Sequence, residues 1–566
     1  MSRLLAVLVP LLVLAAPSVD VRAADPADEG VRIPSLPEQL YRQWVIEEVR
    51  PDTESRERLR TRDDVIERLS LREAVAIALE NNPGIAVERL GPARARAEID
   101  RVNGAFDPIF RADGSVSRIV SPVSSALAGA LVLRQKETRF GFGVEKLLRT
   151  GATFEIAANS EELNTNSRFT GLRPQYKPTL DFSIEQPLLR NFGIDLTILL
   201  VRSAEAGSAI AYYQYEARIA ALVKQVVQAY WRVVQARESL KAEEDGLRLA
   251  RALVKDNEAR VRAGTLPPVA VKEASAEAAS REARVISAEN EVAVAGDALR
   301  LLLQRNPGGT FLPRAIDPAD SPDVREIETD DQLILENAIG GRPEILLTRY
   351  DLQNRKILAK VKRNNLLPSL DLKAAYGLNG LSGRAVPQRS FDSGEIVVTP
   401  FDGDYGRGLD RLSSNDFNSY SAGFAFSVPL GNNAAEAEFV QSQIDVRRGE
   451  LGYKQLLADV TLEVRRTIAD VRASSKRITA TRLARELAAE TLDQQRKRYE
   501  VGLSTTKDLL DFQQRLTSAR AEEIRALVDY NVSVASLRQA EGTLLEQFDI
   551  VLEALPPAPT PFWARF

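Results

Sequence analysis

The chain has 566 residues, of which 44% are hydrophobic and 27% charged, and its 75 Lys and Arg against 79 Asp and Glu give a formal net charge of -4. This composition argues against wholesale disorder, and the mild acidity offers no basic face for nucleic acid. Cys and His are both absent, which excludes disulfides, thiolate nucleophiles, imidazole bases and most transition-metal sites. We therefore expect no catalytic residue, no cofactor and no bound metal, and favour a structural, binding or transport protein over an enzyme.

The first 24 residues are predicted to form an export signal. A short basic start precedes an apolar run from Leu4 to Ala16, and small residues follow between Val21 and Ala24, as at a signal cleavage site. The apolar run is too short to cross a bilayer as a helix. Residues 25–69 form a polar, Pro-containing extension to which the sequence assigns no function.

A tandem duplication organises the rest of the chain. Four markers recur in the same order, namely Pro83, Pro108, Pro187 and Gly264 in the first half and Pro343, Pro368, Pro429 and Gly502 in the second. Their spacing predicts one repeat at 70–304 and another at 332–547, joined by a linker at 305–331 and followed by a Pro-rich tail at 548–566. Each repeat begins with a helix, and Ser70 and Glu73 have the spacing of a capping box for the first of them.

Strands follow in each repeat, at 106–187 and 368–430. Leu180, Phe182 and Ile184 alternate with polar residues, and residues 420–428 alternate apolar residues with polar or small ones. Segments of about ten residues with one apolar face suit a barrel wall between lipid and water. An ordinary sheet with one solvated face shows the same alternation, so the strands alone leave both interpretations open. In the second repeat, Gly377 to Asn418 is rich in Gly and Ser and is predicted to be a long exposed loop.

Long helical hairpins come next, at 194–304 and 434–547. Residues 194–263 and 434–501 contain no Pro, and each stretch would form about 105 Å of helix. Apolar residues recur every three or four positions from Val271 to Leu302, with Arg281 as the one polar member, which is typical of a coiled-coil seam. Apolar residues off the seam, such as Trp231, predict packing on both sides, as in the wall of a cylinder.

This plan resembles the TolC family of outer-membrane efflux proteins. The segments that carry the resemblance are Leu71–Pro83, Phe106–Pro108, Gln186–Gly193 and above all Arg498–Ser504, which is similar to the family's motif at the tip before the last long helix. The similarity extends from about Ser70 to Gln547. It implies a mainly α fold with a membrane β-barrel portion, in which a trimer forms a 12-stranded barrel in the outer membrane and an α-helical tunnel across the periplasm.

The resemblance also implies a function and a set of partners. The function is the outer-membrane channel of a tripartite efflux pump or of a type I secretion system. The partners are two further copies of the chain, a periplasmic adaptor protein, an inner-membrane pump reached through that adaptor, and outer-membrane lipid, with no nucleic acid. Nothing in the sequence names the transported substrate.

Two other classes of protein compete with this interpretation. A periplasmic coiled-coil scaffold without a channel is compatible with the helices but not favoured by the strands and the duplication. A hydrolase that uses paired carboxylates is conceivable from the many acidic residues, but no cleft-forming pattern surrounds them.

The resemblance places a periplasmic gate at Asp508, Asp511 and Tyr499. The two carboxylates are three residues apart and share a helix face. In a trimer, six of them would surround one axis, where they would repel one another and attract cations. In the alternative interpretation, Asp508 only caps the helix that begins after Thr505, and Asp511 only pairs with Lys507. The aligned spacing favours the gate.

The helix-to-helix turns are predicted to dock the adaptor. Gly264 and Gly502 stand where a positive φ or a close backbone approach is needed. By the same resemblance, Leu503, and Leu266 in the first repeat, would offer apolar contacts to the adaptor.

Three features depart from the family. Ala270 stands where the family often has an acidic partner for the gate tyrosine, so the latch is either weaker or built from other residues. Pro267 and Pro268 would stiffen the same tip. An extra hairpin at 138–160 would give an 18-stranded trimer if it joined the wall, and we expect it to lie outside the wall, which keeps the count at 12.

Overall fold

The computed structural model of the chain describes residues 66–124, 129–303, 315–322, 324, 330–389 and 396–552. The described residues belong to one compact unit. The predicted export signal and most of the predicted extension, linker and tail lie outside them. No helix in these ranges combines the length and the apolar character that crossing a membrane requires.

The duplication is visible in the helices that open each repeat. Their bounds are Leu71–Asn81 for α4 and Pro83–Asn103 for α5, and Asp331–Gly341 for α9 and Pro343–Asn364 for α10. Pro83 and Pro343 each occupy the first position of a helix, where the missing N–H has no intrahelical partner to lose. The predicted capping box is confirmed, since the Glu73 N–H donates to Ser70 Oγ at 3.3 Å and the Ser70 N–H donates to Glu73 Oε2 at 2.9 Å.

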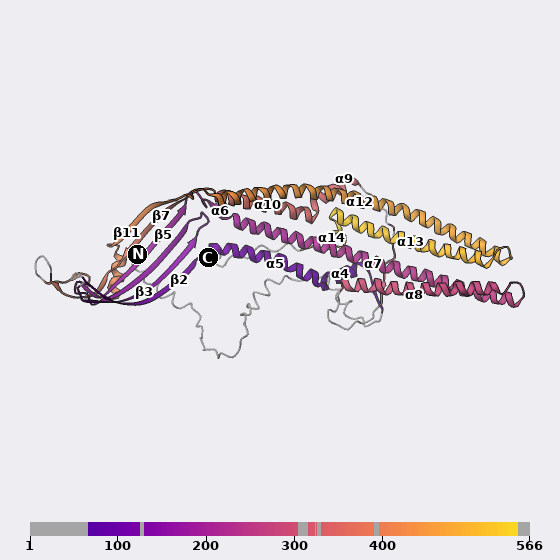
Figure 1. The fold of residues 1–566 in the computed structure, drawn as a ribbon, viewed down its shortest axis with the longest axis horizontal. Helices are drawn as coiled ribbons and strands as arrows, with labels where there is room; N and C mark the ends of the chain where they lie inside the picture. Colours follow the sequence, from indigo (N-terminus) through magenta and orange to yellow (C-terminus); the bar gives the residue numbers. More distant parts are fainter. Residues whose placement is uncertain are drawn as a thin grey trace, which may run out of the picture. The chain divides into compact units, whose positions relative to one another are not determined.

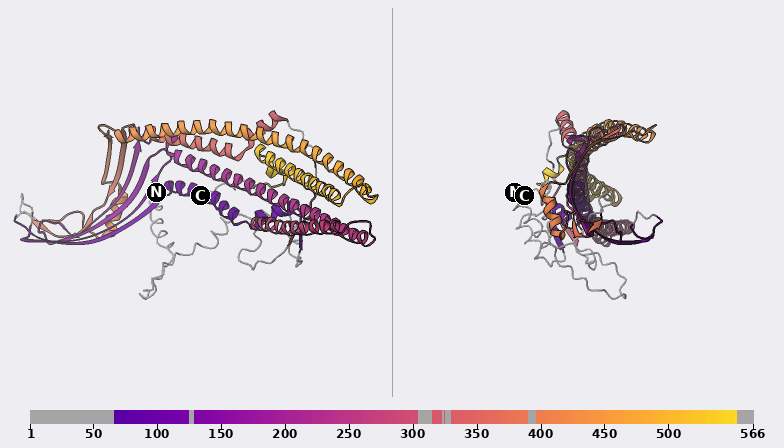
Figure 2. Two further views of the ribbon diagram at one scale, coloured as in Figure 1. Left: turned by 45° about the vertical axis from the view of Figure 1, so that its right-hand side comes forward. Right: turned by 90° about the vertical axis from the view of Figure 1, so that its left-hand side faces the viewer.

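The two long hairpins form one layer of helices. The first consists of α7 (Leu199–Arg262) and α8 (Val269–Leu303), and the second of α12 (Asn433–Glu500) and α13 (Thr506–Glu541). Contacts between α7 and α13 set the hairpins side by side in the order α8, α7, α13, α12 (Figures 1 and 2). Towards the strands, α5 and α10 pack on either side of α7, and α10 also contacts α12. The layer is therefore four helices wide in both halves.

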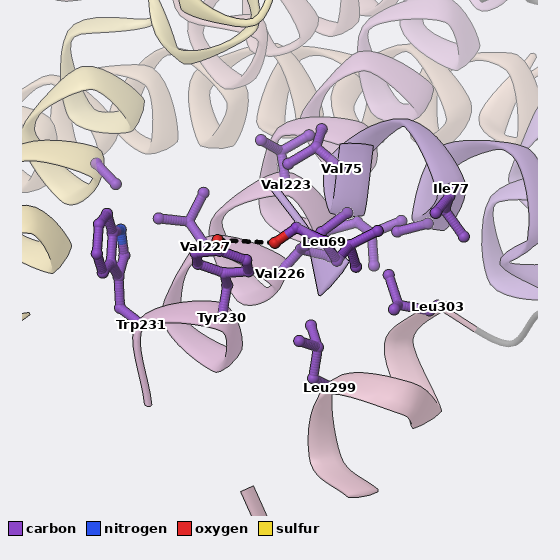
Figure 3. Close-up of a cluster of buried hydrophobic side chains, with 14 of the residues drawn as sticks. Leu69, Val75, Ile77, Val223, Val226, Val227, Tyr230, Trp231, Leu299 and Leu303 are labelled. Carbon is purple, nitrogen blue, oxygen red and sulfur yellow. Dashed lines mark hydrogen bonds between the residues drawn. The ribbon is translucent and has the colours of Figure 1, made fainter. Parts of the chain in front are cut away.

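A hydrophobic core lies where the opening helices meet α7. It gathers Val75 and Ile77 of α4, Val223 and Val226 of α7 and Leu299 of α8, all at most 2% exposed (Figure 3). Beside them, β1 (Ile66–Leu69) pairs in parallel with β6 (Ala315–Pro318). The hydroxyl oxygen of Tyr230 lies 3.0 Å from the Leu69 carbonyl and 2.9 Å from Asp320 Oδ2, which joins α7 to this small sheet.

The predicted seam of α8 is buried against its neighbours. Ala274 and Leu299 are fully buried, and so is Arg281, whose Nε lies 2.9 Å from Glu277 Oε1. Its guanidinium lies against Gly246 of α7, where a Cβ would come within 2.5 Å of Arg281 Nη1. Gly246 thus leaves the room that a buried arginine needs.

Six long strands form one antiparallel sheet. The strands are β2 (Ile109–Pro122), β3 (Val132–Leu147), β4 (Thr153–Thr165), β5 (Leu172–Pro187), β7 (Ser369–Asn379) and β11 (Asn418–Ser427), in the order β11-β7-β5-β4-β3-β2. A short strand, β8 (Ser382–Ala385), also pairs with β5. Three short helices complete the described elements outside the segment between β8 and β11: η1 (Gly104–Phe106), α6 (Ile194–Thr197) and α14 (Leu544–Gln547).

The sequence predicts a hairpin at 138–160 that lies outside the wall, but the structure places this hairpin within the sheet. The hairpin consists of parts of β3 and β4, and these strands lie between β2 and β5. Ladder hydrogen bonds on both sides of the hairpin explain the position, because a hairpin outside the sheet would leave those backbone groups unpaired.

The segment from Gly377 to Asn418 is not only an exposed loop. It contains the end of β7, strand β8, the short pair β9 (Gln388–Arg389) and β10 (Ile396–Val397), and helix α11 (Tyr405–Ser414). The Asp404 carboxylate accepts from the Arg407 N–H and caps α11. The guanidinium of Arg411 donates to the Leu381 carbonyl at 2.6 Å, and the Tyr405 ring meets Tyr176 of β5 edge-on. These tertiary contacts order a segment whose composition predicts a loop.

Candidate functional site

Both hairpins end in the same turn. Gly264 has φ of +72° and Gly502 has φ of +79°, as predicted for these positions. In each turn the residue after the glycine donates its N–H to a carbonyl five residues earlier, Thr265 to Arg260 and Leu503 to Arg498, both at 2.9 Å. This is the Schellman arrangement, which requires a left-handed residue at the glycine position. The repeat thus reproduces one turn geometry at two places in the chain.

Large apolar side chains are exposed to solvent at the two turns. Leu503 and Val501 are each 70% exposed, and Val269 is 56% exposed. Leu266 is half-buried. Large apolar side chains in this setting suit a surface that contacts another protein.

Asp508 caps the first turn of α13. Its Oδ2 accepts from the Thr505 hydroxyl at 2.7 Å and from the Thr505 N–H at 3.1 Å, while the Asp508 N–H donates to Thr505 Oγ1 at 3.2 Å. The Ser504 hydroxyl lies 3.4 Å from the same carboxylate oxygen. Asp508 therefore has the contacts of a capping box, as the alternative interpretation describes.

These hydrogen bonds affect the titration of Asp508. Because the Thr505 hydroxyl and N–H both donate to the charged carboxylate, the pKa of Asp508 is lowered below its usual value. A carboxyl group with a lowered pKa contributes stability above its unfolded pKa and loses that contribution as the pH falls through the folded pKa. The capping carboxylate of Asp508 is therefore charged at neutral and mildly acidic pH.

Asp511 lies one turn further along α13 and is exposed. In the ranges that the structure describes, no ion pair joins Asp511 to Lys507. The pairing proposed in the alternative interpretation is therefore absent there, and the Asp511 carboxylate points to solvent in the single chain.

Tyr499 is buried in a polar network between the two hairpins. Its hydroxyl donates to Asn257 Oδ1 and lies 3.3 Å from Thr506 Oγ1. Asn257 Nδ2 in turn donates to the Ala270 carbonyl at 3.1 Å and to Thr506 Oγ1 at 3.2 Å. Tyr499 is 4% exposed and Asn257 is 0% exposed. We call Tyr499, Asn257, Thr506 and the Ala270 carbonyl the clasp.

A cation lies over the clasp from the first hairpin. The guanidinium carbon of Arg260 is 4.9 Å from the centre of the Tyr499 ring, and Arg260 Nη1 donates to the Tyr499 carbonyl at 3.4 Å. Asp256 Oδ2 lies 3.0 Å from Arg260 Nε and fixes the guanidinium. A cation over an aromatic face adds a second link between α7 and α12.

The clasp links Tyr499 to the first hairpin although Ala270 replaces the acidic partner that the family often has. The Ala270 side chain offers no acid, but its backbone carbonyl accepts from Asn257, and Asn257 itself accepts from Tyr499. The sequence contains a signal for Asn257, because Leu247, Ala250, Leu253 and Asn257 follow each other at spacings of three and four on α7, with Asn257 as the one polar member. A buried polar residue in an apolar seam needs a partner.

The hydrogen bonds of the clasp can hold the tips of the two hairpins together or let them separate. Each side-chain hydrogen bond between Asn257 and the pair Tyr499 and Thr506 crosses from the first hairpin to the second, and the apolar contacts around them are few, involving Leu253, Leu509 and Leu510. Water can replace such hydrogen bonds when the hairpins separate, at a net cost of about 0.5–1.5 kcal/mol for each bond. The tip is thus held together by hydrogen bonds that can be exchanged for hydrogen bonds to water.

Comparison with known proteins gives one family. The profile of the family described as "Outer membrane efflux protein" matches residues 199–304 and 334–543, which together make up more than half of the chain. Outer membrane protein TolC of Vibrio cholerae serotype O1 is 25% identical over 355 residues, which is 61% of this chain and 73% of that protein.

Solved structures share the fold. The Campylobacter jejuni CmeC outer membrane channel matches with a TM-score of 0.57 and 17% identity over 84% of this chain and 86% of the channel. The Neisseria gonorrhoeae MtrE outer membrane channel, solved in its open state, matches with a TM-score of 0.56 and 17% identity over 84% of this chain and 89% of the channel.

The clasp predicts an effect of removing one hydroxyl. Tyr499→Phe leaves Asn257 Oδ1 buried without its donor, which costs about 1–3 kcal/mol. We expect the amides of Leu253 to Asn257 to exchange hydrogen roughly ten- to a hundredfold faster, measured by mass spectrometry. Tyr453→Phe on the same helix is the control, because the Tyr453 hydroxyl makes no hydrogen bond within the described chain. Equal exchange in the two variants would contradict the clasp.

The cap predicts a pH dependence. Asp508→Ala removes the carboxylate that accepts from the Thr505 hydroxyl and N–H, and we expect faster amide exchange at residues 506–509, corrected for intrinsic rates, at pH 7 and at pH 5 alike. Because the pKa of Asp508 is lowered, the difference from the wild-type chain should disappear only below about pH 4. Asp511→Ala, on the same helix, should leave this segment unchanged. A difference that fades between pH 7 and pH 5 would show that the carboxylate is not stabilised in its charged form.

Proposed function

The chain belongs to the family of outer membrane efflux proteins, and from this premise we propose that three copies assemble into the outer-membrane duct of a three-part export machine. The family consists of efflux channels of the outer membrane with helices that extend into the periplasm, and its members are transport proteins rather than enzymes. The predicted family, fold, channel function and localisation are therefore confirmed. The assembly, the gate and the partners are the proposal.

Exposed apolar residues on the outermost helix support the homotrimer. α12 lies at one edge of the helical layer and presents a series of side chains that are each about half exposed: Val440, Ile444, Leu451, Leu462, Leu483 and Leu487. Spacings near multiples of 3.5 residues are those of a coiled-coil seam. At the other edge, α8 presents Ile286, Val294 and Leu301, each at least 60% exposed. A second copy that sets its α8 against the tip half of this α12, and its α5 against the half nearer the strands, would cover both series.

The clasp is the observation that carries the gate. Buried hydrogen bonds hold the second hairpin to the first at Tyr499, and the capped start of α13 presents Asp508 and Asp511 directly after the turn. In a closed trimer the two carboxylates of each chain would form rings at the narrowest part of the tunnel. Opening would separate Tyr499 from Asn257 and carry the carboxylates outwards.

The two turns are the proposed docking site for a periplasmic adaptor. Leu503 is exposed on a Schellman turn, and Leu266, two residues after Gly264, is half-buried at the turn of the first hairpin. Gly264 and Gly502 set the turn geometry, because no side chain tolerates their positive φ without strain. The adaptor would connect the duct to an inner-membrane pump. We favour efflux over type I secretion because the description of the matched family names efflux.

The gate predicts a change in ion selectivity. A ring of six carboxylates makes a pore cation-selective and open to block by multivalent cations. In planar bilayers, the double variant Asp508→Asn, Asp511→Asn should lose most of its cation selectivity and need at least tenfold more trivalent cation for block from the tip side. The control is Glu490→Gln with Asp493→Asn, an exposed acid pair at the same spacing on α12. Unchanged selectivity and block in the Asp508, Asp511 variant would reduce both residues to structural roles.

The docking surface predicts a loss of binding without a loss of assembly. Leu503→Glu places a charge on the apolar contact, and we expect at least tenfold less adaptor to co-purify after chemical crosslinking in the native host. Thr265→Glu, at the equivalent position of the first turn, introduces the same charge where no apolar side chain is lost. If both variants bind equally, Leu503 does not contact the adaptor. The yield of trimer should match the wild-type yield in both.

A further inference from the structure

We infer that the hairpin β3–β4 is part of the channel wall and that three chains close a cylinder of 18 strands, in which β11 of each chain pairs with β2 of the next. This inference rests on the trimer proposed above. It adds the number of strands, the two edges that meet and the faces that they must share.

The first observation is the continuity of the ladder. β3 pairs with β2 from Val132 to Glu145 and with β4 from Gln135 to Leu147. β4 pairs with β5 from Thr153 to Leu163. Both strands of the hairpin are therefore hydrogen-bonded on both sides over most of their length. A hairpin folded over the mouth or against the outside would break at least one of these ladders.

The second observation is a row of apolar side chains across all six strands. Residues that lie directly opposite one another in successive pairs are Phe110, Val144, Ile156, Phe182, Tyr376 and Tyr420. Rows two residues away continue this face with Phe142, Phe154, Leu180 and Leu378, among others. Because directly opposite residues share a face, the hairpin contributes to the same apolar surface as the strands on either side of it.

The opposite face is polar and built of small residues. The adjacent row consists of Arg111, Gly143, Ala157, Asp181, Gly377 and Ser419. A Cβ on Gly377 would come within 2.7 Å of Asp181 Oδ1 and 2.8 Å of Ser419 Oγ. A Cβ on Gly141 would meet Asn159 and Asp113 equally closely. Glycines that admit polar neighbours suit the crowded inner side of a curved wall, so the polar face lines the lumen and the apolar face meets lipid.

The edges of the sheet require a partner. β11 is exposed along its whole length, with Tyr420 at 84% and Phe424 at 72%, and Val116 of β2 is 69% exposed. An unpaired strand edge cannot face hydrocarbon, because its N–H and C=O groups would have no hydrogen-bond partner. With six strands in alternating directions, β11 of one chain runs antiparallel to β2 of the next. A second copy therefore supplies the missing ladder on both edges.

The apolar and polar faces of the sheet also restrict the register in which β11 of one chain can pair with β2 of the next. Even-numbered residues of both β2 and β11 lie on the apolar face, and odd-numbered residues lie on the polar face. If the apolar face is to continue from one chain to the next, odd-numbered residues of β11 must stand opposite odd-numbered residues of β2. A slip by one residue would turn one chain's polar face towards lipid.

The radius of an 18-stranded cylinder agrees with the radius of the ring of helices. Strands about 4.8 Å apart and tilted by about 40° give a cylinder with a radius of about 18 Å for 18 strands and about 12 Å for 12. Four helices per chain, about 8–10 Å apart, give a ring of 12 helices with a radius of about 15–19 Å. Six strands per chain therefore match four helices per chain without a step in the wall.

Cysteine crosslinking in the full-length chain tests the inference, because the native sequence contains no Cys. We expect Ser421→Cys, combined with Cys at one or more odd-numbered positions from 111 to 117, to form covalent dimers and trimers upon oxidation in membranes. Combinations with the even-numbered positions from 112 to 118 should form none. Within one chain, Asp181→Cys should link to Ala157→Cys, which lies directly opposite on β4.

Two further outcomes separate this inference from the proposed trimer. A trimer by mass in which Asp181→Cys links to the odd-numbered positions of β2 would place β5 beside β2, with 12 strands in the wall. That result overturns the inference and leaves the proposed function intact. A stable monomer by mass, with no link between chains for any combination, would overturn both.

Discussion

A wall one element thick cannot bury both of its faces or pair both of its edges within a single chain. The helical layer leaves apolar series exposed on α12 and α8, and within the described residues the sheet leaves β2 and β11 without partners on one side. The long Pro-free helices, the alternating strands and the duplicated plan all serve this one constraint. In the trimer that we propose, the chain would form one third of a closed structure, in which copies of the same chain cover what each copy leaves open.

Within the chain, two kinds of contact hold the hairpins together, and they differ in how easily they open. Around α4 and α7, side chains such as Val223 and Val226 are fully buried in a large apolar core, so separation there would expose much apolar surface to water. At the tip, the core is small and the clasp of Tyr499, Asn257 and Thr506 contributes hydrogen bonds that water can replace. The gate that we propose at the tip needs this distribution, with its weakest contacts at the end that would move.

Local features of the sequence predicted much of this fold. Pro83 and Pro343 predicted helix starts, Ser70 with Glu73 predicted a cap, and Gly264 with Gly502 predicted left-handed turns, because each depends on one residue and its near neighbours. The sequence did not predict contacts between distant segments. Asn257 finds its partner Tyr499 242 residues away, and alternation assigns residues of the hairpin at 138–160 to faces but does not say which strands flank it. Helix α11 was missed for the same reason, since Arg411 and Tyr405 order it through tertiary contacts.

An electron cryomicroscopy reconstruction of the full-length chain in lipid nanodiscs tests the central claim most directly. The account predicts three chains around one axis, with α12 of each chain against α8 of the next and with Asp508 and Asp511 at the narrowest part of the closed tunnel. A single chain in the nanodisc, or a trimer closed at its tip by other residues while Asp508 and Asp511 face outwards, would contradict it.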